Sequence, residues 1–311
     1  MSKRKKTVFF IGGSSFIGST IINDLNEDDY YPILLSRNID QCRSKINFKG
    51  DYQLVHGSLG EIEKYIHIFR DNQIDFIVHL SSNIIPSSSI REYEREYREI
   101  IEPTVNLINN PLVSTSKFIY FSSGGMIYGN PSNTINEKLP VDPKNFYAKA
   151  KAIIEEKLIT NKSNLKYVIL RPSNVYGRYV KIKHNQGFIE NSVTRMLKDE
   201  PIEIWGDPDQ SRDYIFIDDL SSIFQELISK ECSNMIFNIA LGKSYAVSEI
   251  IKILEKYLNK KAVIKFLPNN KQDVDHIHFD VSLMAKNFNH KPLDLEQGIV
   301  SFLRKNNSIK P

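Results

Sequence analysis

Short apolar runs alternate with longer amphipathic segments along the first half of the chain. Residues 7–11 form the first apolar run, which ends in glycines, and an amphipathic segment follows to about residue 25. Later apolar runs lie at 33–35, 53–56, 76–80, 117–121 and 166–170, and segments of helical periodicity lie between them at 61–70, 89–109 and 146–160. Because buried strands that alternate with helices build parallel sheets covered on both faces, the pattern predicts a doubly wound α/β fold.

The pattern changes after residue 172. Loops mix with helical segments at 187–198 and up to about residue 230, the latter with Asp218 as its candidate N-cap, and a short strand is predicted at 201–204. A second alternation of strands and helices is predicted at 235–239, 248–259, 262–266 and 295–304. We therefore expect a larger domain at 1–172 and a smaller C-terminal α/β lobe at 173–311, with segments of the lobe returning to the first domain.

Composition and charge exclude several classes of protein. A chain of 311 residues that is 41% hydrophobic can bury a core. The net charge of +4 is matched by the basic residues at 3–6 alone, so no nucleic acid partner is expected. Cys42 and Cys232 are the only cysteines, so we expect no disulfide framework and no metal site. No stretch is long and apolar enough for a signal peptide or a membrane span, and we expect a cytoplasmic protein without membrane contact.

The glycine-rich turn at 12–18 joins the first strand to the first helix. Glycines allow a tight turn and the close approach of a pyrophosphate, whose charge then lies at a helix N-terminus. Ser15 stands where a third glycine is usual, and its side chain narrows the approach of the pyrophosphate. The alternative is that the turn has a purely structural role. The candidate cofactor residues of this turn are Gly12, Gly13, Ser15, Phe16, Ile17 and Gly18.

The second strand ends in Ser36, Arg37 and Asn38, about 20 residues after the glycine turn, where a dinucleotide site contacts the adenosine ribose. An acidic residue there would bind the ribose hydroxyls of NAD, whereas Arg37 can pair with the 2′-phosphate of NADP. The sequence therefore favours NADP over NAD, although an arginine merely exposed at a strand end is the alternative.

Tyr147 and Lys151 place a phenol and an ammonium four residues apart at the start of a predicted helix. At this spacing both side chains leave the same helical face. A nearby lysine favours the phenolate and lowers the tyrosine pKa from about 10 toward the operating pH, as a general acid/base needs. We therefore expect Tyr147 to exchange a proton with an alcohol.

Taken together, several motifs in the chain resemble those of the extended short-chain dehydrogenase/reductase family, and they are most similar to its nucleotide-sugar epimerase and dehydratase branch. The motifs that carry the resemblance are 12–18, 121–129, Tyr147 with Lys151, 170–177 and 212–220. The resemblance spans nearly the whole chain. It implies a Rossmann-like fold, a bound nicotinamide cofactor, a nucleotide-activated sugar in the C-terminal lobe, and a homodimer formed through the helices at 89–109 and 146–160.

The resemblance also implies roles for individual residues. Tyr147 is the acid/base, and Lys151 tunes it and holds the nicotinamide ribose. Asn174 and Arg212 contact the diphosphate of the sugar nucleotide; a guanidinium suits a phosphate well, and an ion pair with Asp213 or Asp207 is the alternative for Arg212. Further expected cofactor contacts are Ser58, Leu59, Leu80, Ser81 and Ser82.

Two departures from the family pattern affect these expectations. The usual catalytic serine or threonine would fall at Gly124, so we expect Ser123, or less readily Ser122, to supply the hydroxyl. Ser58 replaces an aspartate that relatives commonly place near the adenine. Losing one such hydrogen bond slows a reaction without abolishing it.

The predicted function is hydride transfer at carbon 4 of a nucleotide-linked hexose, with a 4-epimerase favoured by a narrow margin over an NADPH-dependent 4-keto-sugar reductase. Dehydration is disfavoured because Gly125 and Met126 stand where related dehydratases carry acids. A non-catalytic NADP-sensing module is a third alternative. We expect loops at 178–187 and 269–275 to select the sugar, and the resemblance suggests polysaccharide or glycoconjugate precursor synthesis.

Along 89–109, Tyr93, Tyr97 and Ile101 form an apolar stripe that is either a core face or a dimer seam.

Overall fold

The computed structural model describes residues 4–131, 133–177, 187–205, 209–268 and 277–308. The chain forms two compact units, and it passes between them several times. Unit 1 comprises Met1–Ile127, Pro143–Arg171 and Ile223–Phe237. Unit 2 comprises Tyr128–Asp142, Pro172–Ser222 and Asn238–Pro311.

Unit 1 is built on a seven-stranded sheet, which confirms the predicted Rossmann-like α/β fold. The strand order is β10-β6-β5-β4-β1-β2-β3, and every pairing from β6 to β3 is parallel. Since the order reverses between β1 and β4, the carboxyl ends of these two strands form the edge where such sheets bind ligands. The strands are β1 (Lys6–Ile11), β2 (Tyr30–Ser36), β3 (Gln53–His56), β4 (Ile74–His79), β5 (Lys117–Phe121), β6 (Lys166–Pro172) and β10 (Met235–Ile239), the last of which continues into unit 2.

The helices of unit 1 follow the predicted pattern with two changes. The segment predicted as one helix at 61–70 is a 3₁₀ helix followed by an α-helix, with non-helical backbone at Glu61. The segment at 89–109 contains one π-helical turn between two α-helices. The helical elements are α1 (Phe16–Asn23), α2 (Ile39–Arg43), η1 (Leu59–Tyr65), α3 (His67–Asp71), α4 (Ile90–Glu96), η2 (Tyr97–Ile101), α5 (Glu102–Asn109), η3 (Pro111–Val113), α6 (Gly124–Ile127) and α7 (Phe146–Ile159).

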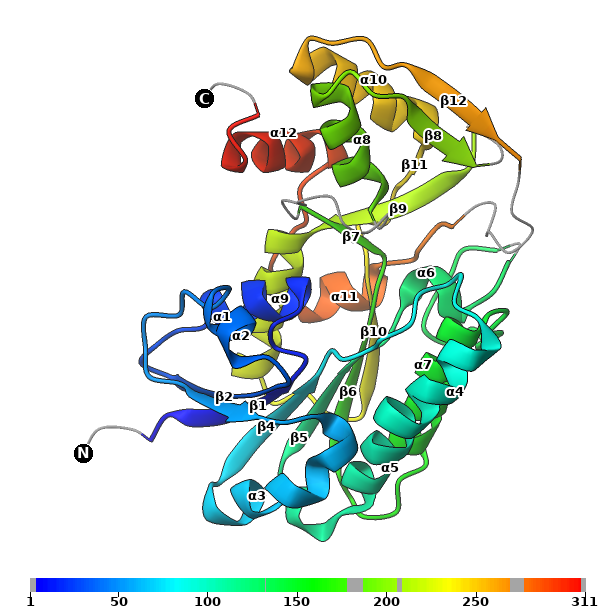
Figure 1. The fold of residues 1–311 in the computed structure, drawn as a ribbon. Coiled ribbons are helices and arrows are strands. Elements are labelled where there is room, and N and C mark those ends of the chain that lie inside the picture. The colour runs from blue at the N-terminus through cyan, green and yellow to red at the C-terminus, as the bar shows by residue number, and fades with distance from the viewer. Residues whose placement is uncertain (1–3, 132, 178–186, 206–208, 269–276, 309–311) are drawn as a thin grey trace. The chain divides into compact units, whose positions relative to one another are not determined.

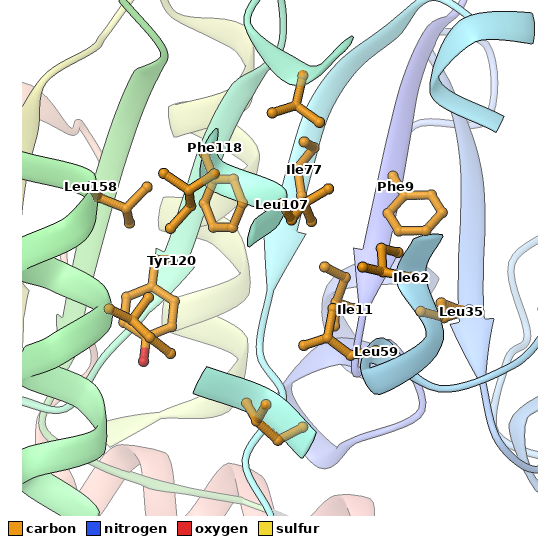
Figure 2. Close-up of a cluster of buried hydrophobic side chains, with 14 of the residues drawn as sticks. Phe9, Ile11, Leu35, Leu59, Ile62, Ile77, Leu107, Phe118, Tyr120 and Leu158 are labelled. Carbon is orange, nitrogen blue, oxygen red and sulfur yellow. The ribbon is translucent and has the colours of Figure 1, made fainter. Parts of the chain in front are cut away.

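The strands of unit 1 bury side chains on both faces. On one face Phe9, Ile11 and Ile77 pack with side chains of α5 and α7 such as Leu107 and Leu158, as Figure 2 shows. In Figure 1 these helices and α4 run along the sheet together. The alternate positions Val8 and Phe10 are also fully buried, on the opposite face. Burial on both faces explains why the strands appear in the sequence as continuous apolar runs.

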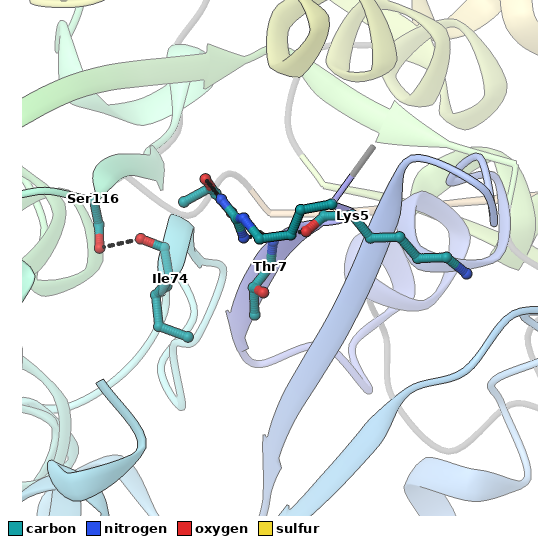
Figure 3. Close-up of polar contacts among 6 residues, drawn as sticks. Lys5, Thr7, Ile74 and Ser116 are labelled. Carbon is teal, nitrogen blue, oxygen red and sulfur yellow. Dashed lines mark hydrogen bonds and ion pairs between the residues drawn. The ribbon is translucent and has the colours of Figure 1, made fainter. Parts of the chain in front are cut away.

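The start of β1 is fixed by side-chain hydrogen bonds to its neighbours. The Asp75 carboxylate accepts from the Thr7 N–H at 2.7 Å and pairs with Arg4 at 2.7 Å. At the same end of the sheet the Ser116 hydroxyl donates to the Ile74 carbonyl at 2.8 Å (Figure 3). These contacts lie at the edge opposite to the glycine turn.

Unit 2 contains a three-stranded and a two-stranded sheet. In the first, β9 pairs with β7 in parallel and with β11 antiparallel, and in the second β12 and β8 are parallel. The helix α9 starts in unit 2 and ends in unit 1. The elements are β7 (Asn174–Tyr176), α8 (Phe188–Leu197), β8 (Ile202–Trp205), β9 (Ser211–Phe216), α9 (Ile217–Ser229), β11 (Ser244–Ala246), α10 (Val247–Leu258), β12 (Ile264–Leu267), α11 (Ser282–Asn287) and α12 (Leu295–Lys305).

The predicted N-cap role of Asp218 is wrong. Because β9 leads directly into α9 at Ile217, Asp218 lies inside the first helical turn. Its carboxylate instead pairs with Lys305 of α12. The short strands β7 and β11 were not anticipated, since three residues are too few to show a periodicity.

A buried ion pair joins α7 to β6 in unit 1. The Arg171 guanidinium donates to both carboxylate oxygens of Glu155, at 3.0 Å and 2.5 Å, and each side chain is 3% exposed. Such pairs add little net stability when intact, but removing one partner leaves a buried charge and is strongly destabilising.

We predict that Glu155→Ala lowers the free energy of unfolding by about 3–5 kcal/mol, because Arg171 loses its carboxylate partner while remaining buried. Urea denaturation followed by circular dichroism measures this loss. The matched control is Glu156→Ala, at an exposed position of the same helix, which should change the free energy by less than about 0.5 kcal/mol. Equal effects of the two substitutions would contradict the prediction.

Candidate active site

The glycine turn after β1 has room only for hydrogen at two positions. Gly12 has a φ of 84°, and a Cβ there would lie 2.9 Å from the Ser81 backbone nitrogen. A Cβ at Gly18 would lie 2.7 Å from the Gly12 carbonyl oxygen. Close backbone packing at the N-terminus of a helix that follows β1 is what a dinucleotide pyrophosphate needs. The turn therefore fits the diphosphate of a bound dinucleotide.

Ser15 has a role that the sequence analysis did not identify. Its side chain is the N-cap of α1 and accepts from the Gly18 N–H at 3.1 Å. A serine is among the preferred N-cap residues, so its presence in place of a third glycine stabilises the start of α1. Phe16 and Ile17 form the first turn of that helix.

Arg37 follows β2 and donates to the Asn83 side-chain oxygen at 3.1 Å. Asn83 belongs to the segment after β4, so the guanidinium is directed across the ligand-binding edge. Ser36 donates to the Asn38 carbonyl, and the Asn38 side chain caps α2. Nearby, Lys45 donates to the Ser14 carbonyl of the glycine turn at 2.9 Å.

The other predicted cofactor residues follow β3 and β4. Ser58 donates to the exposed Glu61 carboxylate, whereas Leu59 is buried in the core. The Leu80 N–H donates to the Ile11 carbonyl at 2.9 Å, which brings the end of β4 against the end of β1. Ser81 is the residue that a side chain at Gly12 would meet. These contacts place Leu80 and Ser81 at the glycine turn.

Tyr147 and Lys151 lie in the first two turns of α7, whose N-cap Asn145 accepts from the Ala148 N–H at 2.8 Å. Lys151 is 5% exposed and donates to the Phe121 carbonyl at the end of β5, at 2.9 Å. Its Nζ lies 5.7 Å from the centroid of the Tyr147 ring. Ser123, two residues after β5, lies close enough to Tyr147 for its hydroxyl to lower the pKa of the phenol. The fold thus brings Ser123, Tyr147 and Lys151 together.

The predicted lowering of the Tyr147 pKa is wrong for this structure. Burial raises the pKa of Tyr147, the hydrogen bond with Ser123 lowers it in part, and the Glu96 carboxylate raises it further. Burial also lowers the pKa of Lys151, to about 8. The lysine is directed to a backbone carbonyl and not to the phenol, so desolvation outweighs its attraction for the phenolate.

The sequence analysis missed Glu96, which is 2% exposed on α4. Its carboxylate accepts from the Ser82 hydroxyl at 2.9 Å and from the Asn83 N–H at 3.0 Å. Of the predicted stripe, Ile101 is buried but Tyr97 is 45% exposed, so Tyr97 does not belong to a core face of this chain, and the alternative of a dimer seam stays a prediction. Glu96 takes the inward position because it lies three residues after the partly buried Tyr93, on the same face of α4.

The end of β4 holds a second buried polar group, His79. Its Nε2 lies 2.8 Å from the Thr104 hydroxyl, and its ring packs edge-on against Tyr120 at 5.5 Å. Burial and the neighbouring Lys151 lower the pKa of His79 to about 3. At neutral pH it is therefore an uncharged part of the core beneath the site.

The predicted diphosphate ligands Asn174 and Arg212 lie on adjacent strands of unit 2. The Asn174 amide donates to the Asp213 carbonyl at 2.9 Å, and Arg212 donates to the Ser211 carbonyl and to the Gln210 side chain. The Asp213 carboxylate accepts hydrogen bonds from the backbone N–H groups of residues 241–243. These amides satisfy the buried carboxylate without a contribution from Arg212. Asp207 lies outside the described residues.

The loops in which we expected sugar specificity, 178–187 and 269–275, lie outside the described residues except for Gly187. Within the described part of the chain no cluster of three or more histidine, cysteine, aspartate or glutamate side chains could hold a metal ion. A search of the same residues finds no helix with the length and apolar character needed to cross a bilayer.

Comparison with known proteins assigns the family. The chain is 28% identical over 312 residues to the dTDP-4-dehydro-6-deoxyglucose reductase of Escherichia coli, covering 98% of each chain. The crystal structure of UDP-glucose 4-epimerase with UDP-glucose from Thermotoga maritima superposes with a TM-score of 0.85 at 27% identity, covering 97% of this chain and 99% of that one. The UDP-N-acetylglucosamine 4-epimerase of Methanobrevibacter ruminantium gives a TM-score of 0.84 at 25% identity, covering 98% and 99%.

The NAD dependent epimerase/dehydratase family matches residues 8–240, which include the glycine turn, Ser123, Tyr147 and Lys151. The relatives include an epimerase and a reductase that are similar over nearly the full length of this chain, and a dehydratase that is similar over 80% of it. The resemblance inferred from the motifs is confirmed. The chain is therefore an enzyme of the extended short-chain dehydrogenase/reductase type and belongs to the NAD dependent epimerase/dehydratase family.

Proposed function

We propose that the enzyme is a nucleotide-sugar 4-epimerase that oxidises and re-reduces carbon 4 of a nucleotide-linked hexose. The observation that carries this proposal is the cluster of Ser123, Tyr147 and Lys151 at the edge of the sheet that also bears the glycine turn. A hydroxyl, a phenol and an ammonium are the groups needed to move the proton of a secondary alcohol. The similarity to 4-epimerases over whole chains supports it.

In this proposal Tyr147 Oη takes the proton of the sugar 4-hydroxyl and later returns it. When bound, the nicotinamide supplies the acceptor and donor for the hydride of carbon 4. Ser123 donates a hydrogen bond to the reacting oxygen and holds the phenol beside it. Positive charge near Tyr147 favours its phenolate, so protonated Lys151 is required for the step in which Tyr147 acts as a base.

The same proposal gives the other predicted residues their roles. The residues of the glycine turn, with Leu80 and Ser81, would hold the cofactor diphosphate and ribose. Arg212 and Asn174 would bind the diphosphate of the sugar nucleotide, since a guanidinium matches phosphate oxygens in a bidentate manner. Arg37 favours NADP by its charge, while the family is described as NAD dependent.

The test is incubation of purified enzyme with UDP-galactose, followed by chromatographic detection of UDP-glucose. The cofactor released on denaturation is identified by mass spectrometry. Tightly bound NAD and conversion without added cofactor support the epimerase. Absence of conversion of UDP-galactose, UDP-glucuronate and UDP-N-acetylglucosamine, each with NAD and NADP supplied, would overturn it.

A 4-keto-sugar reductase is the second candidate. Two observations favour it, namely the similarity to the Escherichia coli reductase over 98% of each chain and the position of Arg37 after β2. A reductase would use Tyr147 once, as the acid that protonates the new hydroxyl, and would consume NADPH. Oxidation of NADPH in the presence of dTDP-4-dehydro-6-deoxyglucose, without epimerase activity, would select this candidate.

We predict that Tyr147→Phe lowers kcat by about 10²–10⁴-fold, because the group that moves the proton is removed. Steady-state kinetics with the substrate found above measures the change, and cofactor binding should persist. Tyr97→Phe, which alters an exposed tyrosine, serves as the control and should retain full activity. A Tyr147→Phe enzyme with more than about a tenth of the activity would indicate another acid/base.

We predict that Ser123→Ala lowers kcat by about 10²-fold, because the hydrogen bond to Tyr147 and to the reacting oxygen is lost. The neighbouring Ser122→Ala is the matched control, since the Ser122 hydroxyl is buried without a protein partner among the described residues. Comparison of kcat for the two variants distinguishes the serines. A loss in Ser122→Ala alone would assign the catalytic hydroxyl to Ser122.

We predict that kcat/KM falls as pH rises through about 8, because Lys151 loses its proton there and no longer favours the phenolate. Activity falls toward high pH because the protonated lysine is the active form, and burial lowers its pKa from 10.5 to about 8. A profile from pH 6 to 10 measures the effect. Lys151→Arg, which stays charged throughout this range, should show weaker activity without the fall near pH 8, and an unchanged alkaline limb in that variant would refute the assignment.

A further inference from the structure

Glu96 is a buried carboxylate at the end of α4 that the proposed chemistry does not use. Each of its oxygens accepts one hydrogen bond from the segment after β4, from the Ser82 hydroxyl at 2.9 Å and from the Asn83 N–H at 3.0 Å. This segment directly follows Leu80 and Ser81, which pack against the glycine turn. The carboxylate therefore fixes the backbone beside the proposed cofactor site.

The helix that bears Glu96 packs against the helix that bears the catalytic pair. The Tyr93 ring stacks on the Phe146 ring, with centroids 5.2 Å apart and planes at 27°. Phe146 immediately precedes Tyr147, and Tyr93 and Glu96 are three residues apart on the same face of α4. The Glu96 carboxylate therefore faces the first turns of α7.

Several charged or titratable groups surround Lys151, and all but one are uncharged or neutralised. The groups are Tyr147 and Glu155 on α7, Arg171 on β6, His79 on β4, Tyr120 on β5 and Glu96 on α4. The Glu155 charge is taken by Arg171. Burial keeps His79 uncharged at neutral pH and raises the pKa of both tyrosines.

Glu96 differs from Glu155 in having no close cation. Within the described residues no lysine, arginine or histidine nitrogen lies at ion-pair distance from its carboxylate. Burial raises the pKa of Glu96, and the hydrogen bonds from Asn83 and Ser82 and the charge of Lys151 oppose this rise. Two carboxylates, Glu96 and Glu155, raise the pKa of Lys151, and of these Glu155 is paired with Arg171 while Glu96 is not paired with a cation in the described part of the chain.

We propose that Glu96 is a positioning residue that supplies the counter-charge for Lys151 and holds the Ser82–Asn83 segment against the cofactor edge. The inference rests on the proposed role of Tyr147 and Lys151. It deepens that role, because it names the residue that keeps Lys151 protonated in a buried position. The Glu96 charge also opposes ionisation of Tyr147, so it moves both groups toward higher pKa values.

The test is the titration of Lys151 by nuclear magnetic resonance in protein labelled with ¹³C at lysine Cε. The Lys151 signal is assigned by its loss in Lys151→Met. Glu96→Gln removes the charge but can still accept from the Asn83 N–H, and it should move the Lys151 midpoint down by about one pH unit. The matched control Glu94→Gln, exposed on the same helix, should leave the midpoint unchanged.

Two further measurements keep the proposal falsifiable. Glu96→Asp retains the charge and should restore most of the Lys151 midpoint. If Glu96→Gln does not fold, the coupling is measured at Glu96 instead, because linkage is reciprocal. The titration midpoint of Glu96, followed in protein labelled with ¹³C at glutamate Cδ, should rise in Lys151→Met. A folded Glu96→Gln protein with an unchanged Lys151 midpoint, or an unchanged Glu96 midpoint in Lys151→Met, would overturn the proposal.

Activity gives an independent readout. With UDP-galactose as the probe, Glu96→Gln should shift both limbs of the pH profile of kcat/KM to lower pH, whereas a purely structural role would lower activity equally at all pH values. If the enzyme does not convert UDP-galactose, the proposed function fails while the titration still decides the coupling. A lowered melting temperature without any movement of the Lys151 midpoint would assign Glu96 a structural role alone and reject the proposal.

Discussion

The burial of one ammonium group is the constraint on which the site depends. Lys151 is 5% exposed, and removing an ammonium from water costs several kcal/mol unless donors, acceptors and opposite charges replace the water. The Phe121 carbonyl supplies one acceptor, and Glu96 supplies a negative charge. The protein thus holds a buried lysine whose pKa is lowered to about 8.

This constraint links residues that are distant in the sequence. The parallel register pairs His79 of β4 with Tyr120 of β5, so the ends of these strands lie side by side beneath Lys151. The next residue after β4, Leu80, is hydrogen bonded to the end of β1. One sheet edge therefore holds the glycine turn, the segment bound by Glu96 and the pair of Tyr147 and Lys151, and this is the edge at which such sheets bind ligands.

The two departures from the family pattern have local explanations. Ser15 replaces a glycine but caps α1 through its hydroxyl, so the turn gains a helix start. For the missing hydroxyl at Gly124 the structure offers Ser123 as a candidate, since this serine acts on the pKa of Tyr147. The chain leaves β5 at Phe121 and re-forms a short helix at Gly124, so Ser122 and Ser123 lie between the two elements.

The sequence by itself determined the order of strands and helices, the glycine turn and the pairing of Tyr147 with Lys151. These features depend on periodicity, on glycine and on spacing within one helix, which are local. Only the tertiary structure decided the protonation of the site, because the pKa of Tyr147 depends on burial and on groups from other elements. It also decided that Glu96 is buried, where Ser82 and Asn83 bind its carboxylate, and that Asp218 pairs with Lys305 rather than capping α9. Such outcomes follow from packing between distant segments, which no local pattern encodes.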